Sequence, residues 1–454
     1  MTGRFLLTAG SSGSGKTLLT CGILHTLKRK GYHPASFKCG PDYIDPMFHS
    51  RVLGTKSRNL DTFFADKKTV RWLLEENSRD CDLAVLEGVM GYYDGVAGIT
   101  VTASAWDVAD ATDTPAVLIV NCKGMSVSLV PFIKGFLEYK ENSHIKGVIL
   151  NRMSAMLYPR MKKLIEASLP VKVLGYVPDM KECLLESRHL GLVLPGEIRN
   201  LTRQLDRLAD VLETSLDWEG LLGLAGEAPE IAEAEPALPS GCEPVRIGVA
   251  KDEAFCFFYE DNFRILEKMG AQLVWFSPMH DKRLPEDLSG LMFHGGYPEL
   301  YAERLSKNTA MKQAVKEAVA SGMPCMAECG GFMYLHDTME DMEGTSWSMT
   351  GVICGHVTHT DRLQRFGYVT LLEGTVFGQS AGPIPAHEFH YFDSDSCGDA
   401  FLAQKPESSR SWRCIHSSDT LFAGFPHLYF YGNPKTAQAF LQACGRFGKR
   451  GSDR

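Results

Sequence analysis

Residues 10–17, Gly-Ser-Ser-Gly-Ser-Gly-Lys-Thr, have the residue types and the spacing of a nucleotide phosphate-binding loop. An apolar run at residues 5–8 precedes them and an amphipathic segment follows, which is the strand–loop–helix context that this motif requires. Backbone amides of such a loop converge on phosphates at the positive end of a helix. A plain glycine-rich turn is the alternative. The residues expected to bind ATP are Gly10, Gly13, Ser14, Gly15, Lys16 and Thr17.

Acidic residues follow the next strand-like runs, where they could complete this site. Glu87 ends the apolar run that begins at Leu83, and Asp45 lies in the segment 38–46. The carboxyl ends of parallel strands meet at one edge of a sheet, beside the phosphate loop. Thr17 and Glu87 are therefore candidates to hold Mg²⁺, and the segment 38–46, which contains Asp42 and Asp45, could complete the metal site. Solvated acids at strand ends and turns are the alternative.

Two glycine-bounded loops carry further candidates for contact with a second substrate. The segment 38–46 places Asp42 and Tyr43 beside Asp45, and residues 91–95 contain Asp94. Alone, either loop could be a capped turn. Two such loops near one phosphate site favour the functional interpretation. Asn121 and Asn151, at strand ends, are candidates for contact with adenine.

The second half of the chain contains a candidate nucleophile. Residues 323–333 run from an apolar strand into Glu328, Cys329, two glycines and a helix-like segment. This pattern is typical of a nucleophile on a sharp strand-to-helix turn, where small neighbours allow close backbone approach. A helix N-terminus favours the reactive thiolate. A buried structural cysteine is the alternative.

A reactive thiol needs a base and an oxyanion hole. The chain has 14 histidines, and His427, His387 and His390 are the candidates that spacing leaves open. The loop Gly295-Gly-Tyr-Pro-Glu299 supplies glycine amides that could stabilise a tetrahedral intermediate. We expect Gly296 and Gly330 to form that oxyanion hole; a simple turn is the alternative.

The composition is that of a globular protein with two domains. A chain of 454 residues exceeds one ordinary core, and alternating strand-like and helical runs predict two α/β domains with parallel sheets. A stretch rich in Pro, Ala and Glu separates them, so we predict domains at 1–224 and 244–448 with a linker at 225–243. The net charge of -8 argues against nucleic-acid binding.

Other sequence features concern the environment of the protein. No run is long and apolar enough to span a bilayer, so we expect no membrane partner. The 13 cysteines are scattered, without a Cys-x-x-Cys pair or a convincing secretion signal, which predicts a cytoplasmic protein without a zinc site.

These motifs together resemble the cobyrinate a,c-diamide synthases. Residues 38–46, Lys-Cys-Gly-Pro-Asp-Tyr-Ile-Asp-Pro, match an element of that family, as do residues 86–95. Residues 295–299 and 327–334 match the glutaminase signature of the cobyrinate/cobyrate-type amidotransferases. The resemblance covers nearly the whole chain. It implies a dethiobiotin-synthetase-like P-loop domain followed by a class I glutamine amidotransferase-like domain.

The resemblance also implies roles and partners. Cys329 would attack the glutamine amide and His427 would be its base. Thr17, Asp45 and Glu87 would hold Mg²⁺. ATP would phosphorylate a carboxylate on a corrinoid, with Tyr43 and Asp94 near the ring. Ordinary class I enzymes have His-x-Glu, whereas Tyr429 stands at the third position here, so a Cys–His dyad is expected. The family architecture allows a homodimer.

The expected reaction is amidation of the a and c carboxylates of cobyrinic acid, through acyl phosphates and glutamine-derived ammonia that passes inside the protein. One alternative is the same reaction on hydrogenobyrinic acid or nickel-sirohydrochlorin. Another is a partitioning or scaffold ATPase whose second half is a binding module. The Cys329 turn discriminates against that alternative, because a scaffold has no need for a nucleophile.

Overall fold

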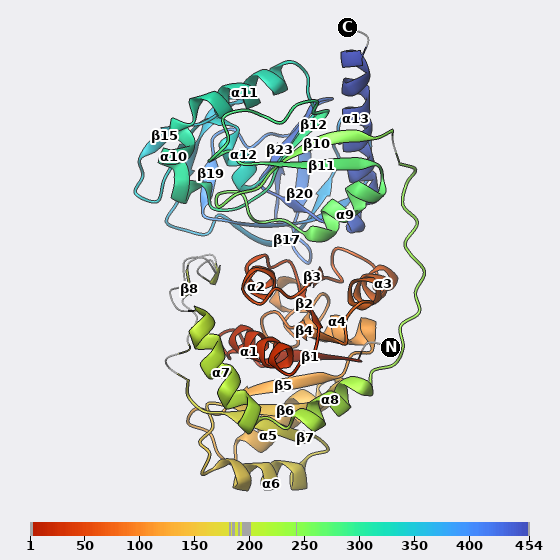
Figure 1. Ribbon diagram of the computed structural model, residues 1–454, viewed down its shortest axis with the longest axis vertical. Coiled ribbons are helices and arrows are strands. Elements are labelled where there is room, and N and C mark those ends of the chain that lie inside the picture. The colour runs from red at the N-terminus through yellow and green to blue at the C-terminus, as the bar shows by residue number, and fades with distance from the viewer. Residues whose placement is uncertain are drawn as a thin grey trace. The chain divides into compact units, whose positions relative to one another are not determined.

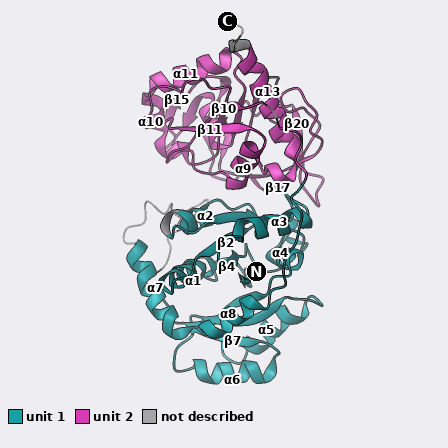
Figure 2. Cartoon of the chain, turned by 45° about the vertical axis from the view of Figure 1, so that its right-hand side comes forward, with its two compact units in different colours: residues 1–236 teal, residues 237–454 magenta. Residues whose placement is uncertain are grey.

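The computed structural model describes residues 3–180, 183, 187–188, 191–192, 201–241 and 243–452. Contacts within the chain divide it into two units, residues 1–236 and 237–454 (Figure 2). Among the described residues, no helix is long and apolar enough to cross a membrane. The predicted α/β fold of both halves is confirmed.

The first unit is built on a seven-stranded sheet in the order β3-β2-β4-β1-β5-β6-β7, and every pairing in it is parallel. Its strands are nearly continuous apolar runs, as expected for a sheet covered on both faces. They are β1 (Gly3–Ala9), β2 (Pro34–Cys39), β3 (Ser57–Leu60), β4 (Leu83–Glu87), β5 (Ala116–Asn121), β6 (Ile145–Asn151) and β7 (Lys172–Val177). A short hairpin, β8 (Ser187–Arg188) and β9 (Gly191–Leu192), follows.

Helices connect these strands, so that α1 and α7 lie together on one face while α3 and α4 lie on the other (Figure 1). The helices are α1 (Lys16–Arg29), α2 (Ile44–Met47), α3 (Lys67–Ser78), α4 (Ala105–Thr112), α5 (Leu129–Glu138), α6 (Tyr158–Ser168), α7 (Leu201–Ser215) and α8 (Trp218–Gly226). A π-helical turn, η1 (Phe48–Val52), continues α2, and a 3-10 turn, η2 (Val96–Gly98), follows β4. This arrangement places the loops after β1, β2 and β4 at one edge of the sheet.

The expected linker, residues 225–243, spans the division between the two units. Its first part packs on the first unit, because Ala228 and Ile231 are buried and Glu233 pairs with Arg71 at 2.9 Å. The described residues of the remainder, 234–241 and 243–244, have no helix or strand. The predicted boundaries at 224 and 244 stay a prediction.

The second unit has a six-stranded sheet in the order β11-β10-β12-β13-β23-β22, parallel except at β22. Its strands are β10 (Val245–Ala250), β11 (Ala271–Phe276), β12 (Gly290–Phe293), β13 (Cys325–Glu328), β22 (His416–Ser417) and β23 (Leu421–Gly424). Its helices are α9 (Glu260–Lys268), α10 (Ala302–Lys307), α11 (Thr309–Ala320), α12 (Gly330–Tyr334) and α13 (Pro434–Ser452), with 3-10 turns η5 (Pro298–Tyr301) and η6 (Phe430–Gly432).

Two smaller sheets contain the short strands of the later part of the chain. One joins β14 (His336–Glu340), β15 (Ser346–Ser348), β16 (Ile353–His359) and β19 (Phe392–Ser394). The other joins β17 (Arg365–Leu372), β18 (Ile384–His390), β20 (Phe401–Gln404), β21 (Ser411–Cys414) and β24 (His427–Leu428). The last strand, β24, carries the candidate base.

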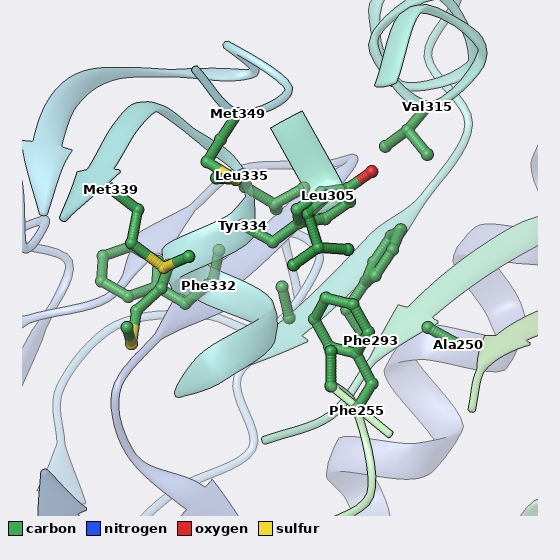
Figure 3. Packing of buried hydrophobic residues seen from close by; sticks show 14 of the residues in the cluster. Ala250, Phe255, Phe293, Leu305, Val315, Phe332, Tyr334, Leu335, Met339 and Met349 are labelled. Atoms are coloured by element: carbon green, nitrogen blue, oxygen red, sulfur yellow. The ribbon is translucent and has the colours of Figure 1, made fainter. Parts of the chain in front are cut away.

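A cluster of apolar side chains supports the turn that holds the candidate nucleophile. Phe332 and Tyr334 on α12 are fully buried, together with Phe255 and Phe293 (Figure 3). The Tyr334 ring lies edge-on to Phe255 with centroids 5.4 Å apart. Close packing of large rings fixes α12 against β12, and therefore fixes the residue from which the helix begins.

Candidate functional site

The phosphate loop lies between the end of β1 at Ala9 and the start of α1 at Lys16. Gly15 has φ 91° and ψ 18°, a left-handed conformation that favours glycine. The Asn151 side chain at the end of β6 donates a hydrogen bond to the Ser14 carbonyl at 2.9 Å. The loop is thus braced by a strand two positions away in the sheet. Neither this contact nor the bond from the Lys123 amide to Asn121 tests their predicted role toward adenine.

Lys16 is folded back onto backbone carbonyls. Its Nζ donates to the Ser11 carbonyl at 3.1 Å and to the Met90 carbonyl. Burial, and then the nearby charge of Lys38, lower the pKa of Lys16 to about 8. A phosphate group would replace these neutral partners with opposite charge, so the lysine is placed to gain from binding an anion.

The predicted metal ligands come together in the structure. Thr17 Oγ1 donates to Glu87 Oε1 at 2.6 Å and lies 3.3 Å from Asp45 Oδ2. Lys38, opposite Glu87 in the register of β2 and β4, places Nζ 2.9 Å from Glu87 Oε1 and 2.5 Å from Asp45 Oδ2. Lys38 is the first residue of the segment 38–46, but its residue type and position alone predicted no role for it.

Charge within this cluster is strongly perturbed. Burial opposes ionisation of Glu87, but Lys38 and His49 hold the pKa of this carboxyl well below its usual range. Burial, followed by the charges of Asp42 and Glu87, raises the pKa of Asp45. His49 lies with Nε2 3.2 Å from Glu87 Oε2, and its Nδ1 lies 2.6 Å from Ser36 Oγ. No local sequence pattern marks His49 as part of this cluster.

The cluster fits Mg²⁺ in its donor chemistry, since a hydroxyl and two carboxylates are hard oxygen ligands. The described residues contain no group of three or more His, Cys, Asp or Glu side chains arranged to hold a metal. Mg²⁺ usually keeps several waters and binds through one or two carboxylates together with substrate phosphates. Thr17, Asp45 and Glu87 therefore suit a metal that arrives with a nucleotide.

The predicted substrate residues lie on the neighbouring loops. Asp42 Oδ1 accepts from the amides of Ile44 and Asp45 at 2.7 and 3.1 Å and so caps α2. Asp94 is exposed, and its Oδ2 accepts from the Gly91 amide at 2.8 Å, where a Cβ on Gly91 would lie 2.8 Å from the Gly10 carbonyl. This loop therefore abuts the phosphate loop. Tyr43 is half-buried beside Asp42. Contact of these residues with a substrate stays a prediction.

Cys329 stands on a strained turn between β13 and α12. Its φ is 45° and its ψ is -108°, a conformation that L-residues rarely adopt and that marks functional turns. Its amide donates to the Gly424 carbonyl of β23 at 2.8 Å. A Cβ on Gly331 would lie 2.6 Å from the Phe293 backbone, so this close approach requires glycine. The geometry is that of a nucleophile elbow.

The structure brings His427 to Cys329. The two side chains share a hydrogen bond. A Cβ on Gly295 would lie 2.5 Å from His427 Cε1 and 3.5 Å from Cys329 Cβ, so this glycine makes room for both. Burial alone would lower the pKa of His427, but Cys329 and Glu328 raise it to about 10. These contacts favour the protonated, imidazolium form of His427 beside the thiol.

The two other histidines are placed differently. His390 Nε2 lies 3.1 Å from Glu388 Oε2 and its Nδ1 lies 2.6 Å from the Phe392 carbonyl, so both ring nitrogens are engaged. His387 is the strand partner of His427, and burial lowers its pKa to about 3. Neither has a recorded contact with Cys329. Among the three candidates, His427 is the one in position to act on the thiol.

The predicted oxyanion glycines also lie close together. The Gly296 amide nitrogen is 3.1 Å from the point where a Cβ on Gly330 would lie. The Gly330 amide opens α12 directly after Cys329, where it has no partner within the helix ladder. The two glycines thus lie on adjoining loops, one of them directly after Cys329, and their role as an oxyanion hole stays a prediction.

Family models match both halves of the chain. Residues 5–192 match the CobQ/CobB/MinD/ParA nucleotide binding domain, and residues 246–434 match the CobB/CobQ-like glutamine amidotransferase domain. The fold and the two sites therefore define an enzyme that joins a nucleotide-binding domain to a glutamine amidotransferase domain. The alternative of a scaffold with a binding module is not supported.

Full-length relatives narrow this class. The cobyrinate a,c-diamide synthase of Caldanaerobacter subterraneus subsp. tengcongensis is 38% identical over 98% of this chain and 99% of its own length. Those of Priestia megaterium and Listeria innocua are each 36% identical, over 98% of this chain and 98% and 100% of theirs. The chain belongs to the cobyrinate a,c-diamide synthase family, which confirms the resemblance carried by the motifs.

Proposed function

We propose that this chain amidates the a and c side-chain carboxylates of cobyrinic acid, using ATP and ammonia released from glutamine. The observation that carries the proposal is the presence of a complete phosphate loop and a Cys329–His427 pair in one chain. The relatives named above support the choice of cobyrinic acid. The sequence motifs do not distinguish rings by the metal that they contain, so the test should include other tetrapyrroles.

In the second unit, the Cys329 thiolate attacks the amide carbon of the glutamine side chain. The amides of Gly296 and Gly330 stabilise the oxyanion, and His427 donates a proton to the leaving ammonia. The resulting thioester is hydrolysed by water, which releases glutamate and restores the thiol. Burial of His427, which is 3% exposed, keeps the proton within the site.

In the first unit, the loop residues hold ATP so that a ring carboxylate attacks the γ-phosphate. Oxide is a poor leaving group from a carboxylate, and conversion to an acyl phosphate lets ammonia displace inorganic phosphate. Lys16 offsets charge on the β- and γ-phosphates during transfer. Asp94, on the loop that abuts Gly10, would lie beside the carboxylate substrate.

Mg²⁺ fits the oxygen donors of Thr17, Asp45 and Glu87, and when bound it would neutralise phosphate charge. Lys38, between the two carboxylates, keeps them close together before the metal arrives. Without the positive charge of Lys38, repulsion between the two carboxylates would favour protonation of one of them.

The test incubates the protein with glutamine, ATP, Mg²⁺ and cobyrinic acid and follows the ring by mass spectrometry. Parallel reactions contain hydrogenobyrinic acid or nickel-sirohydrochlorin. Two successive amidations of cobyrinic acid support the proposal. Turnover of another ring alone would overturn cobyrinic acid as substrate and leave the amide-forming mechanism.

The Cys329→Ala variant separates the two half-reactions. Glutamine-dependent amidation and glutamate release are expected to disappear, while amidation with added ammonium salt persists because the first unit is unchanged. Glutamate release that survives in Cys329→Ala would show that another group is the nucleophile.

A further inference from the structure

The carboxylate that completes a Cys–His–acid triad is absent from its usual place here, because Tyr429 occupies the second position after His427. We propose that Glu328, the residue directly before the nucleophile, takes over this part as a positioning residue that orients His427. The proposal rests on the proposed glutaminase role of Cys329 and His427 and adds a member to that site.

Glu328 lies beside the Nδ1 atom of the His427 imidazole. Its Oε2 lies 3.6 Å from His427 Nδ1, within the range of an ion pair. Contacts of this kind are often long in sites without substrate and shorten when substrate binds. The other oxygen, Oε1, accepts from the backbone amide of Leu428 at 3.3 Å. One buried carboxylate therefore hydrogen-bonds to the strand that carries His427 and lies within ion-pair distance of its ring, too far for a hydrogen bond to Nδ1.

The backbone explains why this residue can reach the histidine. Glu328 is the last residue of β13 and pairs with Gly424 of β23, three residues before His427. The turn at Cys329 sends the nucleophile into the site while Glu328 stays in the sheet beneath β24. Glu328 is 3% exposed, and a buried carboxylate requires a partner. The Glu328 carboxylate faces the His427 ring and accepts a hydrogen bond from the Leu428 amide.

The residue at the usual position of the acid is engaged elsewhere. Tyr429 Oη donates to Asp261 Oδ2 at 3.1 Å, in a contact between β24's end and α9. Cys329 also raises the pKa of His427. Two neighbouring histidines, His294 and His387, have pKa values that burial and the charge of His427 lower to about 3. Both of these histidines are buried and favour the neutral form, whereas Glu328 is a carboxylate whose charge raises the pKa of His427.

Burial raises the pKa of Glu328, and the contact with His427 opposes that rise. In return, Glu328 contributes to the raised pKa of His427. Loss of the negative charge would therefore destabilise the imidazolium. The pKa of His427 would fall by about one unit, as expected for the loss of an opposite charge at the distance of Glu328.

The test is Glu328→Gln, which keeps an acceptor for the Leu428 amide but removes the charge. We expect kcat for glutamine hydrolysis to fall about 10²-fold. The alkaline limb of the kcat/KM profile should move to lower pH by about one unit, while KM for glutamine changes little. Amidation from ammonium salt should equal wild type, which shows that the first unit is intact.

The matched control is Glu388→Gln, because Glu388 is also buried and also pairs with a histidine, His390, at 3.1 Å. It should leave the alkaline limb in place. If Glu328→Gln keeps wild-type kcat and pH profile, the inference is overturned while the proposed function stands. If both variants lose activity with the limb unmoved, Glu328 is structural only, which also overturns the inference. Absence of glutamine hydrolysis in the wild-type protein would overturn both proposals.

Discussion

Lys38 is the residue whose removal should most disturb the nucleotide site from within. Its side chain is 3% exposed, and its ammonium lies 2.5 Å from Asp45 and 2.9 Å from Glu87. Replacement by methionine keeps the length of the side chain and leaves two buried carboxylates without their shared cation. Breaking a buried pair in this way costs about 3–5 kcal/mol.

The assay is hydrogen exchange of the β4 peptide, Leu83–Glu87, followed by mass spectrometry. About 1.4 kcal/mol corresponds to a tenfold change in an equilibrium constant, so β4 amides should exchange about 10²- to 10³-fold faster. Local exchange suits a protein of two units, because a single unfolding free energy does not describe it.

The control is Lys67→Met, which removes an exposed pair with Asp110 at 2.8 Å. Exposed pairs contribute about 0–1 kcal/mol, so β4 should exchange nearly as in wild type. Glutamine hydrolysis in the second unit should be unchanged in both variants. An acceleration in Lys38→Met no greater than that in Lys67→Met would refute the view that Lys38 holds the carboxylates together.

Two further substitutions probe the thiol site. Gly295→Ala places a Cβ 2.5 Å from His427 Cε1, so the ring must move. A displacement of about 1 Å should lower the rate of glutamine hydrolysis about 10²-fold without loss of ammonium-dependent amidation. A rate near wild type would mean that the ring adapts. Tyr429→Phe removes the hydrogen bond to Asp261 and should cost about 1.5–3 kcal/mol in local stability, measured by hydrogen exchange of α9, yet leave the pH profile of hydrolysis unmoved. A shifted profile would show that Tyr429 acts on His427 after all.

The first unit could be predicted from the sequence in more detail than the second. The phosphate loop, the buried strands and the acidic residue after β4 are local patterns, and parallel strands bring their carboxyl ends to one edge. Lys38 and His49 could not be found in this way, because their part depends on which neighbours their side chains reach. Register between β2 and β4 sets Lys38 opposite Glu87, and no local pattern contains that register.

In the second unit, residue spacing predicted the nucleophile but left its base open, and only the family resemblance pointed to His427. Cys329 is marked by its own neighbours, since a strand before it and glycines after it are what a sharp turn requires. A histidine has no such local signature. His427 is selected by the pairing of β18 with β24, which sets His427 beside His387, and by the packing that engages His390 with Glu388. Both are long-range contacts.

Glu328 shows why the expectation of a simple dyad needed the structure. A search along the chain looks for the acid at a fixed distance after the histidine, and there it meets Tyr429. The imidazole responds to a negative charge near Nδ1, whichever strand supplies it. A carboxylate at the end of β13 supplies that charge from the strand that also presents the thiol. Attack, protonation and orientation would then depend on two adjacent residues and one histidine, and a change of the Cys329 turn would disturb all three steps together.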